Sequence, residues 1–143
     1  MAKTSVMVTQ SYIDQLTYKI IGCAIEVHKE LGPGLLENIY EKCLIHELKL
    51  NGFDVKSQMS IPLYYKGIDM DCNLRFDILV EDLVLVELKS VVTMHPIFEA
   101  VLLTYMKLLR KPKDILFNFN CKNLFHEGQK TFVNEYYAKL PSK

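Results

Sequence analysis

The sequence predicts an α/β fold in which a mixed sheet of at least four strands is flanked by helices. Two helical patterns come first, three strand-like segments follow, and a third helical pattern precedes a further apolar strand. Helices and sheets each have to bury an apolar face, so this order favours layers of helix and sheet around a common core. We expect the 143 residues to form one domain, with residues 1–9 as a flexible arm.

The first two elements are predicted to be helices. Apolar residues recur every three or four positions from about Gln10 to Leu31, as on one face of an amphipathic helix. Gly32-Pro33-Gly34 should end this helix, because Gly allows a left-handed cap and Pro cannot continue the hydrogen-bond ladder. A second helix is expected over about residues 36–50, with Asn51-Gly52 as its stop.

The middle of the chain changes to strand patterns. Strands are expected over residues 55–65, 71–80 and 83–90, with turns at Lys66-Gly67 and Glu81-Asp82. The third of these strands is apolar on both faces except at one point, which is typical of a strand covered on both sides.

The last predicted elements are a helix and a strand. His95-Pro96 should open a third helix that runs to about residue 109, because Pro suits the first helical turn. Its two apolar stripes predict that it packs between layers. Residues 114–120 are expected to form another buried strand, and the tail after it is left unassigned.

Composition excludes several classes of function. Lys plus Arg and Asp plus Glu each number 17, so the chain cannot hold nucleic acid by bulk positive charge. No apolar run reaches the roughly 18 residues that a membrane span needs, and we expect a cytoplasmic protein. The four cysteines contain no close pair, which favours buried reduced thiols over a zinc site.

Charged residues interrupt two of the apolar strands. Glu87 and Lys89 point to the same face of one strand, because strand side chains alternate with period two. Asp77 interrupts the preceding strand. If Asp77 lies opposite Glu87, Val80 pairs with Val84 and the two Cβ atoms lie about 5 Å apart, close enough for both carboxylates to share one cation. A two-residue loop would put Glu87 on the other face, so we predict a three-residue loop or a bulge.

Two carboxylates and an ammonium group on one sheet face suit metal-dependent hydrolysis. Carboxylate oxygens hold Mg²⁺ or Mn²⁺, which polarises a phosphoryl oxygen and lowers the pKa of a bound water. Lys89 could orient that water or stabilise charge on the phosphate. A structural ion pair between Lys89 and one of the acids explains the same residue types, so residue types alone leave both interpretations open.

These motifs resemble those of a known nuclease superfamily. Asp77 followed by Glu87-Leu88-Lys89 is similar to the D…(D/E)-x-K signature of the PD-(D/E)XK nucleases. Residues 34–40 read G-x-x-E-x-x-Y, the pattern of the small bacterial and archaeal GxxExxY proteins, which resemble the helicase-associated and phage exonuclease branch. The resemblance covers roughly residues 12–130, and it implies a restriction-endonuclease-like core in which a helix precedes a three-stranded meander, a crossover helix and a further strand.

The resemblance also implies roles for particular residues. Glu37, Asp77, Glu87 and the carbonyl of Leu88 would be metal ligands, and Lys89 would be the catalytic lysine. Two tyrosines and one valine would line the site: Tyr40, Tyr105 and Val101. Tyr40 and Tyr105 could equally be core residues. Val101 stands where the branch typically has Gln, and Val cannot make the hydrogen bonds of an amide.

The leading hypothesis is a metal-dependent nuclease that hydrolyses phosphodiester bonds in DNA with Mg²⁺ or Mn²⁺. The alternative is a catalytically inactive nuclease fold that serves as a binding or assembly module, which the substitution at Val101 and the neutral net charge favour. A glycoside hydrolase with two carboxylates is a third class, but it gives Lys89 no role and requires a wider carboxylate separation. The apolar residues of the first helix and the tail would allow a homodimer.

Overall fold

The computed structural model describes residues 7–143, and none of the helices in that part is long and apolar enough to cross a membrane. The helices are α1 (Gln10–Leu31), α2 (Glu37–Leu50), α3 (Ile97–Leu109), α4 (Leu124–Glu127) and α5 (Glu135–Ala138). The strands are β1 (Val55–Tyr65), β2 (Ile68–Val80), β3 (Val84–Lys89), β4 (Lys113–Asn118) and β5 (Gln129–Val133).

The expected N-terminal arm is only partly open to comparison. Residues 1–6 of it lie outside the described part of the chain. Thr9 is buried, and its hydroxyl accepts a hydrogen bond from the amide of Tyr12 at 3.0 Å. Thr9 is therefore the N-cap of α1, a role that suits its short polar side chain, and not part of an arm.

The five strands form one mixed sheet in the order β1-β2-β3-β4-β5. Only β3 and β4 are parallel among these neighbours, because α3 carries the chain back across the sheet between them. The predicted mixed sheet is confirmed. Its fifth strand comes from the tail that the sequence left unassigned.

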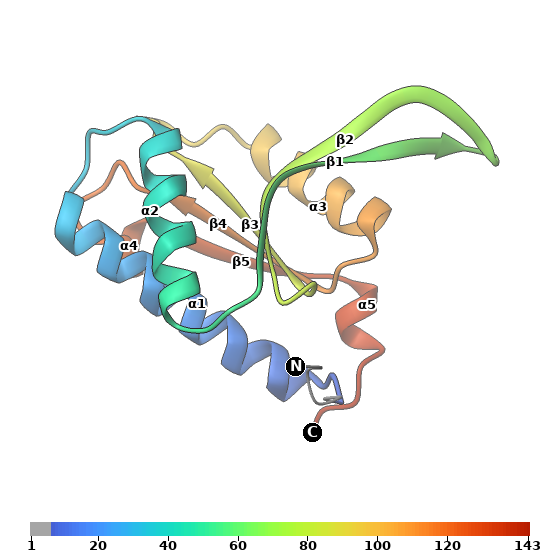
Figure 1. The fold of residues 1–143 in the computed structure, drawn as a ribbon, viewed down its shortest axis with the longest axis horizontal. Helices are drawn as coiled ribbons and strands as arrows, with labels where there is room; N and C mark the ends of the chain where they lie inside the picture. The colour runs from blue at the N-terminus through green and yellow to red at the C-terminus, as the bar shows by residue number, and fades with distance from the viewer. Residues whose placement is uncertain (1–6) are drawn as a thin grey trace.

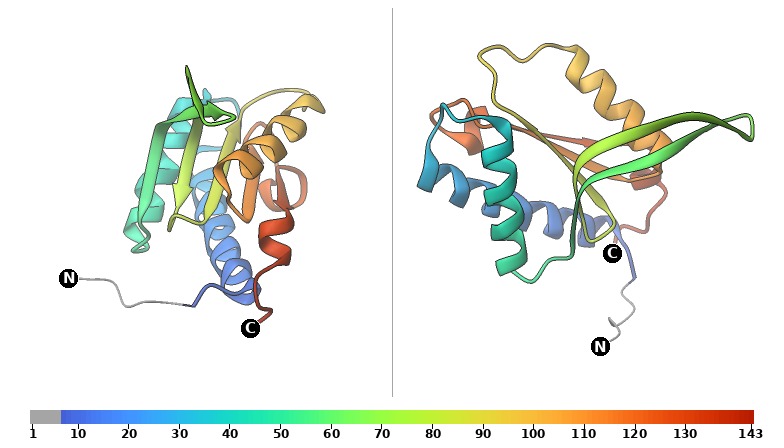
Figure 2. Two further views of the ribbon diagram at one scale, coloured as in Figure 1. Left: turned by 90° about the vertical axis from the view of Figure 1, so that its right-hand side faces the viewer. Right: turned by 45° about the horizontal axis from the view of Figure 1, so that its top comes forward.

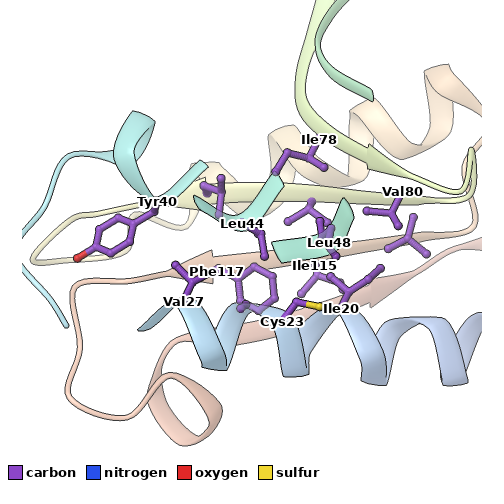
Figure 3. Close-up of a cluster of buried hydrophobic side chains, with 14 of the residues drawn as sticks. Ile20, Cys23, Val27, Tyr40, Leu44, Leu48, Ile78, Val80, Ile115 and Phe117 are labelled. Carbon is purple, nitrogen blue, oxygen red and sulfur yellow. The ribbon is translucent and has the colours of Figure 1, made fainter. Parts of the chain in front are cut away.

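Helices cover both faces of the sheet (Figures 1 and 2). α1 and α2 lie on one face and α3 lies on the other. The larger core cluster fills the space between the sheet and α1–α2, and Figure 3 shows Tyr40, Leu44 and Leu48 of α2 pointing into it. Strand β3 is buried from both sides, as its apolar pattern predicts.

The outer side of α3 is uncovered by the described residues. Leu102 and Met106 are buried against the sheet, whereas Val101, Leu103 and Leu108 are each nearly half exposed. The expectation that α3 packs between layers is wrong. The apolar stripe that contains Ile97, Val101 and Leu108 is about half exposed in the described structure, and only the other stripe packs against the sheet.

Strands β1 and β2 extend as a long hairpin beyond the rest of the sheet (Figure 1). Tyr65 pairs with Ile68, so the two-residue turn is Lys66-Gly67, as predicted. Both turn residues have positive φ, the geometry of the tight turns that suit a twisted hairpin. β2 begins three residues earlier than expected, because the exposed hairpin gives its start no burial pattern to detect.

The register between β2 and β3 agrees with the prediction. Val80 pairs with Val84, and the loop between them has three residues. Lys111 supports this loop, because its ammonium group donates hydrogen bonds to the backbone carbonyl and the carboxylate of Asp82. The pairing continues to Ile78 and Val86 and ends there.

The cysteines carry no disulfide. All four are free thiols, and Cys23 is buried as expected. Cys72 lies exposed on the hairpin, so the expectation of burial is wrong at that position.

Gly128 is linked through Asn118 to the segment at Val91 that follows β3. The amide of Asn118 donates to the carbonyl of Gly128 at 2.8 Å. The side chain of Asn118 in turn accepts from the amide of Val91 and donates to its carbonyl. A Cβ atom at Gly128 would lie 2.5 Å from the carbonyl oxygen of Asn118, so the backbone there leaves no room for one.

We expect Gly128→Ala to lower the free energy of unfolding by about 1–3 kcal/mol, because backbone has to move. The matched control is Gly22→Ala in the middle of α1, where nothing lies within 4 Å of the new Cβ. That change should raise the free energy of unfolding by about 0.5–1 kcal/mol through helix propensity. Urea denaturation measures both, and equal effects of the two substitutions would contradict the packing argument.

Candidate active site

The site lies where β2 separates from β3, at an opening that we call the fork. Beyond the Ile78–Val86 pair the strands separate, and the carboxylate of Asp77 accepts a hydrogen bond from the amide of Leu88 at 3.0 Å. This bond gives a partner to the Leu88 amide, which has none in the β2–β3 ladder. The amide and the carbonyl of one strand residue point to the same edge, so the Leu88 carbonyl also faces the Asp77 side.

The backbone of β2 is irregular at Asp77. Ile78 and Val80 face the core beneath α1 and α2, whereas Phe76 packs with Leu79 in the smaller cluster on the other face. Strict alternation would put Phe76 with Ile78. Across the ladder, Gln58 has a positive φ of 50°. The irregularity turns the Asp77 side chain into the fork instead of onto one flat face of the sheet.

Glu87 is in contact with Asp77 through a hydrogen bond between the two carboxyl groups. The pKa of Glu87 is raised to about 7, mainly by burial and then by the charges of Asp77 and Glu37, while Lys89 opposes them. Two carboxylates this close resist ionising together, because like charges favour keeping one proton between them. The predicted direct pairing of Asp77 with Glu87 in the ladder is not formed, because the ladder ends at Ile78 and Val86, and the two acids interact through their side chains instead.

Lys89 completes this cluster. Its ammonium nitrogen lies 3.8 Å from Oε1 of Glu87. The same nitrogen lies 4.4 Å from the ring centre of Phe98, over the face of the ring. The ion pair and the cation–π contact hold the ammonium group between the acids and α3.

Two carboxylates of α2 face the fork from the other side. Glu37 stands in the first turn of α2 and Glu41 lies one turn later on the same helix face. Both line a hollow of about 460 Å³, here called the α2 hollow. The residues that line it are Leu36, Glu37, Asn38, Glu41, Gln58, Asp77, Leu88 and Ser90.

Glu41 is a site residue that the motif comparison missed. It accepts a hydrogen bond of 2.6 Å from the amide of Gln58. Burial raises the pKa of Glu41, and Asp77 and Glu37 add to this effect, while Gln58 and Arg75 oppose it. The four-residue spacing from Glu37 was the signal in the sequence that could have found it.

The donor set fits a small divalent cation. In the described residues, no three His, Cys, Asp or Glu side chains lie close enough to hold a metal by themselves. Asp77, Leu88 and Glu37 nevertheless line the α2 hollow, and Glu87 interacts with Asp77 from the neighbouring strand. Mg²⁺ needs only a few protein oxygens and keeps several waters. A cation bound there would balance the charges of the two neighbouring carboxyl groups.

A second hollow of about 310 Å³ lies on the α3 side of the same cluster, and we call it the α3 hollow. Its residues are Arg75, Phe76, Leu85, Val86, Glu87, Lys89, Ile97, Phe98, Val101, Leu102, Tyr105 and Asp114. Both Val101 and Tyr105 therefore border the hollow that contains Glu87 and Lys89. Val101 contributes only apolar surface there, where an amide would have offered hydrogen bonds.

Tyr40 is a core residue. It is fully buried and stacks on Phe119, with ring centres 4.4 Å apart. Its hydroxyl donates to the carbonyl of Gly32 at 2.5 Å and accepts from the amide of Leu35. The tyrosine of the G-x-x-E-x-x-Y pattern thus fixes the loop that leads into α2, and through it the start of the helix that carries Glu37.

Comparison with known proteins identifies the superfamily. A family model of the PD-(D/E)XK nuclease superfamily matches residues 14–132. The chain belongs to this superfamily. Its mixed five-stranded sheet flanked by helices is consistent with the restriction-endonuclease-like fold, and PD-(D/E)XK nucleases generally use divalent metals. No curated protein and no solved structure matched the chain, and membership of the GxxExxY branch stays a prediction.

The raised pKa of Glu87 predicts a pH-dependent stability of the metal-free protein. The folded state keeps a proton that the unfolded state loses above about pH 4.5, so stability should fall as the pH rises from there to about 7. Glu87→Gln carries no such proton. Its free energy of unfolding relative to the wild type should be higher at pH 8 than at pH 4, measured by urea denaturation in EDTA.

The exposed Glu135, changed to Gln, serves as the control for this pH experiment. It should give the same difference from the wild type at both pH values, because its carboxyl lies in solvent near the chain's end. A pH-independent effect of Glu87→Gln would show that the buried proton is absent.

Proposed function

We propose that the protein is a metal-dependent nuclease that hydrolyses phosphodiester bonds in DNA. The observation that carries the proposal is the contact of Asp77 with Glu87 beside the Leu88 amide, with the ammonium group of Lys89 at 3.8 Å from Glu87. Superfamily membership supports nuclease-like chemistry, and this cluster contains the residue types that such chemistry requires.

Asp77, Glu87 and the Leu88 carbonyl would hold Mg²⁺ or Mn²⁺, and Glu37 would complete the site from α2. When bound, the cation would polarise the phosphoryl oxygen and lower the pKa of a bound water. The fork geometry prepares this site before any ligand arrives, because the Leu88 amide already fixes one oxygen of Asp77. Prior fixing of ligands reduces the ordering that binding would otherwise require.

Lys89 would act on the phosphate or the attacking water. The aromatic ring of Phe98 and the carboxyl of Glu87 hold its ammonium group at the border of the α3 hollow. A positive charge fixed in a partly buried site stabilises developing negative charge more strongly than one in water. In the proposed nuclease Lys89 acts on the reacting groups, whereas in a purely structural ion pair it would only neutralise the charge of Glu87.

The second candidate is a catalytically inactive nuclease fold that serves as a binding or assembly module. Val101 supports this alternative, because it removes the amide expected beside the site. The third class, a glycoside hydrolase, fits poorly. Its two carboxyl groups stand at least about 5 Å apart, whereas those of Asp77 and Glu87 are hydrogen-bonded to each other.

A homodimer is a further part of the proposal. Ile97, Val101 and Leu108, at spacings of four and seven residues, lie on one face of α3 and are each about half exposed in the described structure. Exposed apolar side chains on one helix face suit contact with a second copy of the chain.

We expect Asp77→Ala to abolish DNA cleavage and Mn²⁺ binding together, because it removes a metal ligand. Lys89→Ala should reduce cleavage by roughly 100-fold or more while Mn²⁺ binding persists. Gel assays of single-stranded, duplex and structured DNA with Mg²⁺ or Mn²⁺ measure cleavage, and isothermal titration measures metal binding.

The control for Lys89→Ala is Lys66→Ala, which removes the same charge at the tip of the hairpin. It should leave cleavage near the wild-type rate. A wild-type protein that binds Mn²⁺ but cuts none of these substrates would favour the binding module, and one that binds no metal even at millimolar concentration would remove the nuclease proposal.

Val101→Gln tests whether the missing amide limits activity. A glutamine at this position could donate or accept a hydrogen bond at the border of the α3 hollow, and we expect cleavage to rise by up to about tenfold. Val101→Leu is the control, because it adds apolar volume without a hydrogen-bonding group. If the two variants cut at the same rate, hydrogen bonding at this position has no part in the reaction.

A further inference from the structure

A hollow outside the candidate active site is lined by basic residues. It has a volume of about 270 Å³ and lies between the end of α1 and α4, and we call it the α4 hollow. The residues that line it are Ile25, His28, Lys29, Lys122, Asn123, Leu124, Phe125 and His126. Half of them are Lys or His, and none of the described residues that line the hollow is acidic. The proposed nuclease chemistry uses none of them.

These basic side chains come together from two separate elements. His28 and Lys29 stand in the last turn of α1, where positive charge suits the C-terminus of a helix. That explanation does not apply to Lys122, which precedes α4 and reaches the hollow because α4 packs beside α1 (Figure 1). The salt bridges within residues 7–143 involve neither lysine. Like charges gathered in one hollow repel each other, and a bound anion would remove that repulsion.

His28 is the buried member of the group. Only 7% of it is exposed, and its Nε2 atom lies 3.1 Å from the carbonyl oxygen of Phe119. A carbonyl oxygen can only accept, so Nε2 carries a proton and the ring is held in place. Nδ1 has no hydrogen-bond partner among the described residues, and it is not enclosed, because Oδ1 of Asp114 is the one enclosed side-chain atom there without a partner. In its charged form the ring can therefore donate from Nδ1 to an anion.

Phe119 connects the α4 hollow with the candidate active site. Its amide donates to the carbonyl of Lys89 at 2.9 Å, and its own carbonyl accepts from His28. β3 and β4 are parallel, so both end at the same edge of the sheet. This edge of an α/β sheet is where ligands commonly bind. A nucleic acid strand that places one phosphate at the fork would bring another close to the α4 hollow.

We propose that the α4 hollow binds a phosphate group of the nucleic acid strand that the active site would cut. The proposal rests on the proposed function, and it adds a second contact that would hold the strand. An ammonium group attracts phosphate oxygens as a point charge, and an imidazolium N–H donates a charge-assisted hydrogen bond to them. A phosphate held here would fix the strand while the next part of it lies at the fork, and such positioning is a large part of catalysis.

A metal ion suits the α4 hollow less well than an anion. His28 and His126 could supply two ligands, but in the described residues no third His, Cys, Asp or Glu lies close enough to complete a site. The neighbouring ammonium groups of Lys29 and Lys122 would also repel a cation.

The salt dependence of binding tests the proposal without any need for cleavage. Fluorescence anisotropy in EDTA would measure the affinity for a single-stranded DNA oligonucleotide over a range of salt concentrations. Each phosphate contact that is lost lowers the slope of log affinity against log salt by about 0.7 to 1. We therefore expect the double variant Lys29→Ala/Lys122→Ala to lower this slope by about 1.4 to 2 and the low-salt affinity by about tenfold. Both lysines are exposed, so the fold should persist.

The matched control is Lys49→Ala/Lys139→Ala, which removes two exposed ammonium groups at the end of α2 and after α5. It should keep the wild-type slope. Equal slopes for the wild type and the hollow variant, or an equal fall in the control, would overturn the inference even if the protein cuts DNA. A fall confined to the hollow variant, in a protein without metal-dependent cleavage, would support the phosphate site and remove the proposed nuclease activity.

Inorganic phosphate shares this chemistry and is tested separately. A neutral methylphosphonate linkage, moved along the oligonucleotide one position at a time, should weaken wild-type binding by about threefold at one position and leave the hollow variant unchanged there. Isothermal titration with sodium phosphate measures binding of the free anion. If free phosphate binds through Lys29 and Lys122 while no linkage gives this difference, the ligand is the free anion and the assignment to a nucleic acid strand is wrong.

Discussion

The hydrogen bond from the amide of Leu88 to the carboxylate of Asp77 is the constraint on which the rest of the site depends. A sheet that stayed fully paired here would use this amide in its ladder and leave no opening for a ligand. Because β2 turns away after Ile78, a side chain has to satisfy the amide, and Asp77 does so. The same bond fixes Asp77 next to Glu87 and turns the Leu88 carbonyl toward both.

The opposite wall of the site is held by a different set of contacts. The hydroxyl of Tyr40 ties the loop after α1 to α2, and the hydroxyl of Ser90 donates to the carbonyl of Leu35 at 2.6 Å. These contacts connect the start of α2 to the end of β3, and so they set the position of Glu37 relative to Leu88. Burying Asp77 and Glu87 together costs stability, which the apolar core under α1 and α2 offsets.

Much of this arrangement could be predicted from the sequence, because burial leaves a periodic pattern. The bounds of α1 and the Val80–Val84 register follow from such patterns, and so does the proximity of the Asp77 and Glu87 side chains. The irregularity at Asp77 could not be predicted, since it depends on Gln58 in another strand adopting a positive φ. The burial of Asp114 could not be predicted either. A single acid at the start of an apolar strand is typical of the end of a turn, and only the fold shows that it is buried.

The neutral net charge bears on how the proposed site would hold nucleic acid. With no excess of positive charge to attract phosphates, and with acids facing the α2 hollow, the free protein repels a polyanion at its own site. A cation on the α2 side would cancel that repulsion. The metal and the nucleic acid would therefore bind the proposed site together, because each reduces the charge that opposes the other.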